Sequence, residues 1–275
     1  MSKFHKISGP YGAVAVRESA GAGKPIVLIH GNSSSSRAFR RQLDGPLGER
    51  RRLIAFDLMG FGDSDRANDL KGYLLPGQAE TVVAVAEALG AANAVFVGWS
   101  LGGHILLEAA PDLGKARGFA IYGTPPIAIP PAMDGAFLPN PAVGIGFTPD
   151  ITKEMAEAYV ASFFAPGFAD VPASFVEDAV KADGMARAQV YASLDPPIYR
   201  DEVKVVEELK APLAILHGAK DTLINGAYFA SLRAPTLWRG AVQTIGAAGH
   251  APHWETPVAF DRLIEAFARD CEAKG

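Results

Sequence analysis

The feature that most constrains the fold of this chain is a short turn that carries a serine between two glycines. An apolar run, residues 94–97, stops at Gly98, and a helix-favouring run covers residues 105–110. Between them stands Gly98-Trp99-Ser100-Leu101-Gly102, which fits the pattern G-x-S-x-G. In that pattern a serine occupies a strained turn between a strand and a helix, and glycines flank it because a Cβ would clash there. A chance match in a chain with 29 glycines is the alternative, but the flanking strand and helix favour a nucleophilic Ser100.

Apolar runs and helix-favouring stretches alternate along most of the chain. Short, continuous apolar runs are typical of strands that are buried on both faces of a parallel sheet. The expected strands cover residues 11–18, 25–29, 52–56, 94–97, 118–123, 212–218 and 241–245. Expected helices lie at residues 38–47, 78–89 and 257–269. This order predicts an α/β protein with a mostly parallel, doubly wound sheet.

One long stretch interrupts the alternation. Residues 124–210 contain clustered prolines and helix-like segments, and no strand is needed to explain them. We therefore expect residues 1–123 and 211–275 to form one core, with residues 124–210 inserted as a helical cap. Because the insertion follows a strand end, we expect it to cover the edge of the sheet where open α/β sheets bind ligands.

A nucleophilic serine at such a turn needs a base and an orienting acid, in the chain order serine, acid, histidine. Asp221 and His250 each follow an expected strand, so both fall at the carboxyl edge of the sheet. His253 is a competing base, and Asp57, which also follows a strand, is a competing acid. The order and topology favour Ser100, Asp221 and His250 as the catalytic set.

Other titratable residues suit these roles less well. Asp201 and Glu202 lie inside the expected cap, away from the strand ends. His30 fits a structural hydrogen-bonding residue at a strand end, whereas His104 fits either a core histidine or a pocket wall. The six histidines show no H-x-H or H-E-x-x-H spacing, so we expect catalysis without a metal or another cofactor.

This set of residues predicts acyl transfer through a covalent intermediate. His250 would take the Ser100 proton while the alkoxide attacks a carbonyl, and Asp221 would hold the imidazole tautomer. Two donors would bind the oxyanion. We expect them to be the backbone N–H of Leu101 and, from the loop after the second strand, Asn32.

Composition limits the partners of the chain. The formal net charge is −4, and no basic cluster points to nucleic acid. The single cysteine, Cys271, allows no internal disulfide. No apolar run reaches membrane-span length, and residues 1–10 lack the apolar stretch of a signal peptide. We therefore expect a cytoplasmic protein that acts on a small molecule and contacts neither nucleic acid nor membrane.

The motifs together resemble the α/β-hydrolase fold family across essentially the whole chain. Four segments also resemble the metal-independent N-acyl-homoserine lactone hydrolases of that fold, namely residues 30–35, 98–104, 123–126 and 249–252. That group opens the lactone ring of bacterial quorum-sensing signals. The resemblance implies that Tyr159 of the cap faces the substrate, and we expect Trp99, next to the nucleophile, to contact it too. Members of the group can carry two consecutive acidic residues where this chain has Asp221-Thr222, so the chain departs from the group at this position.

Several functions remain open at this point. A lactone or ester hydrolase leads, and a carboxylesterase or carbon–carbon bond hydrolase with the same triad is the nearest alternative. A cofactor-free haloperoxidase-like activity uses the same triad. Dehalogenases and epoxide hydrolases of this fold are disfavoured, since they carry aspartate where Ser100 stands. A ligand receptor that has kept the fold without turnover is the alternative outside enzymes.

Overall fold

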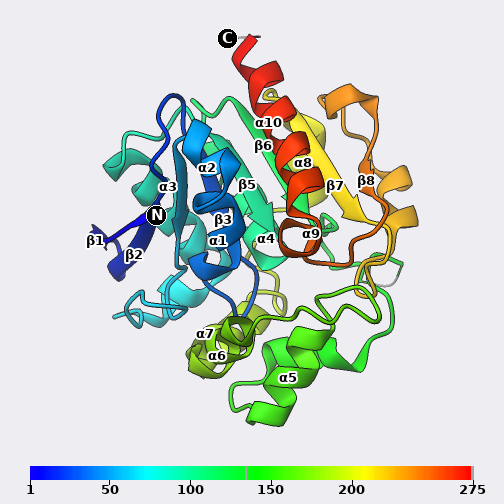
Figure 1. The fold of residues 1–275 in the computed structure, drawn as a ribbon. Helices are drawn as coiled ribbons and strands as arrows, with labels where there is room; N and C mark the ends of the chain where they lie inside the picture. Colours follow the sequence, from blue (N-terminus) through cyan, green and yellow to red (C-terminus); the bar gives the residue numbers. More distant parts are fainter. Residues whose placement is uncertain (134, 274–275) are drawn as a thin grey trace.

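The computed structural model describes residues 1–133 and 135–273, and one sheet of eight strands runs through its centre (Figure 1). The strands are β1 (Lys3–Gly9), β2 (Gly12–Glu18), β3 (Ile26–Ile29), β4 (Leu53–Phe56), β5 (Val95–Trp99), β6 (Gly118–Tyr122), β7 (Leu213–Gly218) and β8 (Gln243–Ile245). Their order across the sheet is β1-β2-β4-β3-β5-β6-β7-β8. From β4 to β8 all neighbours are parallel, and β1 and β2 pair antiparallel. The predicted α/β architecture is thereby confirmed.

Two layers of helices cover the sheet, which explains why its central strands are apolar throughout. Every residue of β3, β4, β5 and β6 is buried, as expected for parallel strands with both faces covered. One layer contains α1 (Arg40–Leu43), α2 (Pro46–Arg50), α9 (Pro252–Glu255) and α10 (Pro257–Ala273), and it faces the viewer in Figure 1. The other contains α3 (Leu75–Ala88), α4 (Leu101–Ala109) and α8 (Glu202–Glu208). Short 3-10 helices lie at Ser36–Phe39, Leu70–Tyr73, Ala110–Asp112, Pro141–Phe147, Gly226–Ser231 and Trp238–Gly240.

Two local predictions were wrong. The first strand expected from the sequence begins at residue 11, yet β1 precedes it and pairs with β2 along its whole length. Its residues are only exposed or half-buried, because it is an edge strand, so no apolar run marks it. Residues 38–47 were expected to form one helix, but a 3-10 turn, α1 and α2 share this region. The break falls at Gly45-Pro46, because proline can begin a helix but cannot continue one.

The insert (residues 124–210) is helical in its described part and contains no strand there. Its helices α5 (Lys153–Ala161), α6 (Ala173–Lys181) and α7 (Gly184–Ala192) gather beyond the end of the sheet to which the arrow of β7 points (Figure 1). The last helix, α8, leaves this group and packs against α4 of the sheet layer. The insert therefore stands over the carboxyl edge of the strands, where Ser100 follows β5.

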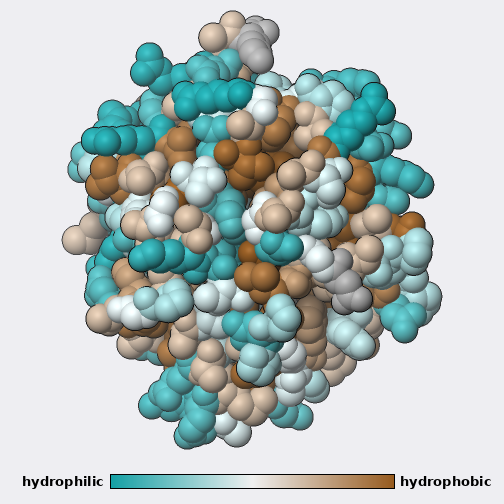
Figure 2. Space-filling view, turned by 90° about the vertical axis from the view of Figure 1, so that its right-hand side faces the viewer, coloured by the Kyte–Doolittle hydropathy of each residue, from teal (hydrophilic) through white to brown (hydrophobic). Residues whose placement is uncertain are grey.

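Large apolar side chains are mostly inside the molecule, with Trp99, Phe96 and Phe119 among the fully buried ones. On the face shown in Figure 2, hydrophobic residues are interspersed with hydrophilic ones. Across residues 1–133 and 135–273, no helix combines the length and the apolar character needed to cross a membrane.

Candidate active site

Ser100 joins β5 to α4 in a backbone conformation that residues with side chains rarely adopt. Its φ is 53° and its ψ is −121°. A Cβ on Gly98 would lie 2.5 Å from the carbonyl oxygen of Gly102, and a Cβ on Gly102 would overlap the carbonyl oxygen of Ile29. Only glycine fits these two positions. The predicted strand–turn–helix is therefore present, and it holds Ser100 in a strained turn at the end of the strand.

His250 and Asp221 form a buried hydrogen-bonded pair. Nδ1 of His250 lies 2.8 Å from Oδ2 of Asp221, and the two side chains are 2% and 1% exposed. Oδ1 of Asp221 accepts the backbone N–H groups of Leu223 at 2.8 Å and Ile224 at 3.1 Å. Burial alone would raise the pKa of Asp221, but the charge of His250 and these hydrogen bonds outweigh it, so the pKa is lowered. Asp221 is thus an ionised acceptor that fixes the orientation of the imidazole.

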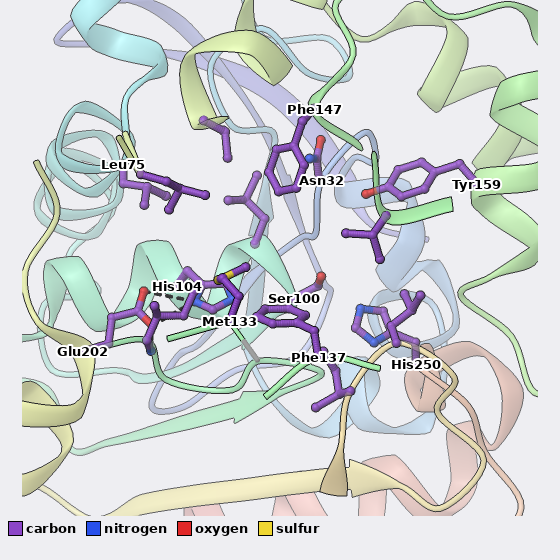
Figure 3. Close-up of a pocket in the computed structure, with 17 residues that line it drawn as sticks. Asn32, Leu75, Ser100, His104, Met133, Phe137, Phe147, Tyr159, Glu202 and His250 are labelled. Carbon is purple, nitrogen blue, oxygen red and sulfur yellow. Dashed lines mark hydrogen bonds and ion pairs between the residues drawn. The ribbon is translucent and has the colours of Figure 1, made fainter. Parts of the chain in front are cut away.

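Ser100 and His250 line the same cavity (Figure 3). Gly123, the residue directly after β6, makes room for the imidazole, because a Cβ there would lie 2.6 Å from Cε1 of His250. Gly123 also has a φ of +60°, which favours glycine. Two glycine-dependent turns therefore place the serine and the histidine at one edge of the sheet.

The expected oxyanion donors lie at this edge as well. Leu101 is the first residue of α4, so its N–H has no acceptor within the helix and lies at the positive end of the helix dipole. Asn32 lines the cavity, and its side chain is fixed from two sides. Its Nδ2 donates to the carbonyl oxygen of Gly146 at 2.6 Å, and its Oδ1 accepts from the Ser33 hydroxyl at 3.0 Å.

The cavity opens to solvent, and its empty volume of about 760 Å³ includes part of that open space. Its walls are largely apolar, and the insert supplies many of them. The apolar lining residues are Leu75, Leu101, Ile127, Met133, Phe137, Val143, Phe147, Val190, Leu194, Leu223 and Ile224. The polar lining residues are Asn32, Ser100, His104, Tyr159, Glu202 and His250.

Tyr159 reaches the cavity from α5 of the insert (Figure 3). Its ring packs edge-on against Phe163, with centroids 4.7 Å apart, and burial raises the pKa of its hydroxyl. Among the described residues the hydroxyl has no hydrogen-bond partner. A Cβ on Gly146 would lie 2.5 Å from this hydroxyl and 3.2 Å from Nδ2 of Asn32. Gly146 therefore packs closely against both polar groups, and a side chain at this position would collide with the Tyr159 hydroxyl.

Trp99 does not line the cavity, contrary to the expectation from its position beside Ser100. Its side chain is only 1% exposed and packs against the ring of His253, with centroids 4.6 Å apart. Its indole N–H donates to the backbone carbonyl of His250 at 2.8 Å. Trp99 is the last residue of β5, and neighbouring residues along a strand point to opposite sides. It therefore supports the histidine loop instead of facing a ligand.

Neither competing residue lines the cavity. His253 is fully buried among aromatic rings, and burial, with smaller contributions from His250 and Arg41, lowers its pKa to about 3. Asp57 is 1% exposed and accepts the backbone N–H groups of Ser36 at 2.6 Å and Asp63 at 2.7 Å, so it fastens loops.

His30 is the structural residue that its position suggested. It is buried, its Nε2 accepts the backbone N–H of Leu58 at 3.0 Å, and its Nδ1 lies 2.8 Å from the carbonyl oxygen of Gly31.

In the part of the chain that the structure describes, no group of three or more histidine, cysteine, aspartate or glutamate side chains is placed to hold a metal ion.

Two acidic residues make contacts near the site that the sequence does not predict. Glu202, expected to lie in the cap away from the strand ends, lines the cavity and pairs with His104, 98 positions away. Glu255 accepts the backbone N–H groups of Gly249 at 2.8 Å and Ala165 at 2.6 Å. It therefore ties the loop of His250 to the insert. No local sequence pattern predicts either contact, because each contact joins segments that are distant in the sequence and meet only in the folded chain.

Comparisons with known proteins agree with the fold. The model of the alpha/beta hydrolase family matches residues 26–263. The AB hydrolase superfamily protein YisY of Bacillus subtilis (strain 168) is 28% identical, covering 91% of this chain and 94% of YisY. A 2-hydroxymuconate semialdehyde hydrolase of Pseudomonas sp. (strain CF600) is 26% identical, covering 92% of this chain and 90% of the hydrolase. The structure of the N-acyl homoserine lactonase AidH complexed with N-butanoyl homoserine superposes with a TM-score of 0.94 at 34% identity, covering 98% of this chain and 97% of AidH.

Proposed function

This chain belongs to the α/β hydrolase family, and we propose that within it the protein opens the lactone ring of N-acyl-homoserine lactones by serine catalysis. The family and its esterase and lactonase members make the chain a hydrolase acting on ester bonds. The resemblance to lactone hydrolases read from the sequence is confirmed by the likeness to AidH. Hydrolysis of such a lactone would inactivate a quorum-sensing signal.

One observation carries the catalytic part of the proposal. Ser100, on a strained turn, and His250, held by Asp221 at 2.8 Å, line a single apolar cavity. A buried, ionised acid that orients a histidine, with a half-buried serine lining the same cavity, is the arrangement that activates a serine hydroxyl.

The first step is attack on the lactone carbonyl. His250 accepts the proton of Ser100 through Nε2, and the serine oxygen forms a bond to the carbonyl carbon. Asp221 holds the proton on Nδ1 and stabilises the imidazolium. The N–H of Leu101 and a donor from Asn32 stabilise the oxyanion, each contributing about 3 kcal/mol to transition-state binding.

The second step breaks the ring. The ester oxygen leaves as an alkoxide, takes the proton from His250, and remains attached to the acyl-enzyme as a hydroxyl group. His250 then takes a proton from water, the resulting hydroxide attacks the acyl-enzyme, and Ser100 regains its proton. The product is the ring-opened N-acyl-homoserine, and no cofactor takes part.

In this proposal the insert (residues 124–210) acts as the cap that recognises the substrate, while residues 1–123 and 211–275 supply the chemistry. The Tyr159 hydroxyl donates a hydrogen bond to a substrate carbonyl, since it lies in the cavity without a hydrogen-bond partner among the residues that the structure describes. The apolar walls accommodate the acyl chain, because they offer few polar groups that an alkyl chain would leave unpaired.

A carbon–carbon bond hydrolase with the same triad is a second candidate. It is favoured by the 26% identity to the 2-hydroxymuconate semialdehyde hydrolase over 92% of this chain. The lactonase assignment ranks first because the likeness to AidH is higher in identity and extends over nearly all of both chains.

Parallel assays test the proposal. Hydrolysis of short- and long-chain N-acyl-homoserine lactones is measured beside p-nitrophenyl esters and a vinylogous 1,5-diketone, with Ser100→Ala as the control. Lactone turnover above ester turnover in kcat/KM is expected. Turnover of the diketone alone would assign the second candidate. A fluorophosphonate probe that fails to label Ser100 would instead point to a ligand receptor.

A further inference from the structure

A second histidine–carboxylate pair lines the cavity, and the mechanism above uses neither of its members. Nδ1 of His104 lies 2.9 Å from Oε2 and 3.0 Å from Oε1 of Glu202. The Glu202 side chain is 2% exposed and that of His104 is 12% exposed. Figure 3 shows the pair on the side of the cavity opposite Tyr159.

The hydrogen bonds of this pair leave one nitrogen unused. Oε2 of Glu202 also accepts the backbone N–H of Ile127 at 2.8 Å, so the carboxylate is bound on both sides. A carboxylate only accepts, so it keeps the proton of His104 on Nδ1. Among the described residues nothing bonds to Nε2 of His104, although the ring lines the cavity. This side of the cavity therefore presents a ring nitrogen that has no hydrogen-bond partner among the described residues.

We propose that Nε2 of His104 recognises an oxygen substituent on the acyl chain of the substrate. This inference rests on the proposed function and names its substrate class: homoserine lactones whose acyl chain carries a hydroxyl or oxo group near the amide. Ser100 lies in the turn before α4 and His104 lies within that helix, and both side chains line the same cavity. A substrate whose carbonyl lies at Ser100 can therefore present an oxygen of its acyl chain to Nε2 of His104.

The effects of the hydroxyl and oxo substituents together indicate the protonation state of the His104 ring. A hydroxyl group can donate to a neutral Nε2 or accept from a protonated one, whereas an oxo group can only accept. A preference for the hydroxyl substrate alone assigns the neutral ring, and a preference for both assigns the imidazolium beside Glu202. An unsubstituted chain would cover Nε2 without a partner, which disfavours its binding.

The experiment compares three lactones with equal chains: N-hexanoyl-, N-(3-hydroxyhexanoyl)- and N-(3-oxohexanoyl)-homoserine lactone. The readout is the ratio of kcat/KM for each substituted substrate to that for the unsubstituted one. Because one hydrogen bond corresponds to roughly a tenfold effect, His104→Leu should lower at least one ratio about tenfold relative to the wild type. Effects common to all substrates cancel in the ratio. If both ratios in His104→Leu stay within threefold of the wild type, the pair is only structural and the proposal is overturned.

Two further variants serve as a control and as a substitute for His104→Leu. Met133→Ala removes an apolar neighbour on the same side of the cavity and should preserve the ratios (Figure 3). His104→Phe keeps a ring of similar size and replaces the leucine variant if that one fails to fold. Binding of the three lactones to Ser100→Ala, with and without the His104 change, gives the same ratio from dissociation constants.

Failure of the two proposals can be told apart. If the wild type hydrolyses none of the three lactones, the proposed function fails. The pair is then tested with p-nitrophenyl butanoate and p-nitrophenyl 3-hydroxybutanoate, where His104→Leu should again lower the ratio about tenfold. An unchanged ratio there overturns the role of His104.

Discussion

Two histidine–carboxylate pairs border one cavity, and they differ in what surrounds each imidazole. His250 follows a strand end, and its carboxylate, Asp221, is held by two backbone N–H groups from the same loop. His104 lies within α4, and its carboxylate, Glu202, arrives from the end of the insert. In our proposals the same type of hydrogen bond therefore supports catalysis at His250, which acts with Ser100, and substrate recognition at His104, whose surroundings are mostly apolar.

The largest expected effect comes from replacing Ser100, the proposed nucleophile, which acts with His250 and not with His104 in the proposed mechanism. Ser100→Ala should lower kcat by about a millionfold, because the triad acts as a unit and the serine forms the covalent bond. Circular dichroism and thermal unfolding check that the fold is kept. Activity within tenfold of the wild type would contradict the assignment of Ser100.

The next effect separates the two carboxylates. Asp221→Asn should lower kcat by about four orders of magnitude, because the amide favours the wrong imidazole tautomer. Glu202→Gln should lower it by no more than about tenfold, since His104 takes no part in proton transfer.

A third carboxylate provides the structural control for this pair of variants. Asp57→Asn should act on stability, because Asp57 holds the backbone of two loops and does not reach the cavity. Its midpoint of thermal unfolding should fall while kcat stays comparable. Loss of activity with Asp57→Asn and not with Asp221→Asn would move the acid to Asp57.

The sequence was most informative where function imposes a local pattern. The glycines around Ser100 and the apolar strands are readable because a tight turn and a doubly covered sheet restrict residue types along a few consecutive positions. The proximity of Asp221 and His250 could be predicted because the fold class puts strand ends at one edge, and the two side chains do pair. The pairing of His104 with Glu202 was not readable, since it depends on how α8 packs against α4. The orientation of Trp99 depended on which side of β5 its side chain leaves.

Tyr159 tests whether the insert recognises the substrate on the side opposite His104. Tyr159→Phe should weaken transition-state binding of acyl-homoserine lactones by about 1–2 kcal/mol, because one hydrogen bond to a carbonyl is lost. Small p-nitrophenyl esters lack the amide and should be affected less. Parallel kcat/KM values decide the matter, and an equal loss on both substrates would make Tyr159 a packing residue.

The smallest expected effect concerns Trp99, whose indole N–H donates to the backbone carbonyl of His250. Trp99→Phe keeps an aromatic ring against His253 but removes the N–H that donates to the carbonyl of His250. Losing that hydrogen bond should raise the activation free energy of turnover by about 1 kcal/mol and so lower kcat, because the loop that positions the imidazole becomes less fixed. The loss should be the same for lactones and p-nitrophenyl esters of any chain length, since the ring does not reach the cavity. His253→Phe, which changes the ring contact but keeps the Trp99 hydrogen bond, is the matched control. A loss in Trp99→Phe that grows with acyl-chain length would mean that the indole contacts the substrate after all.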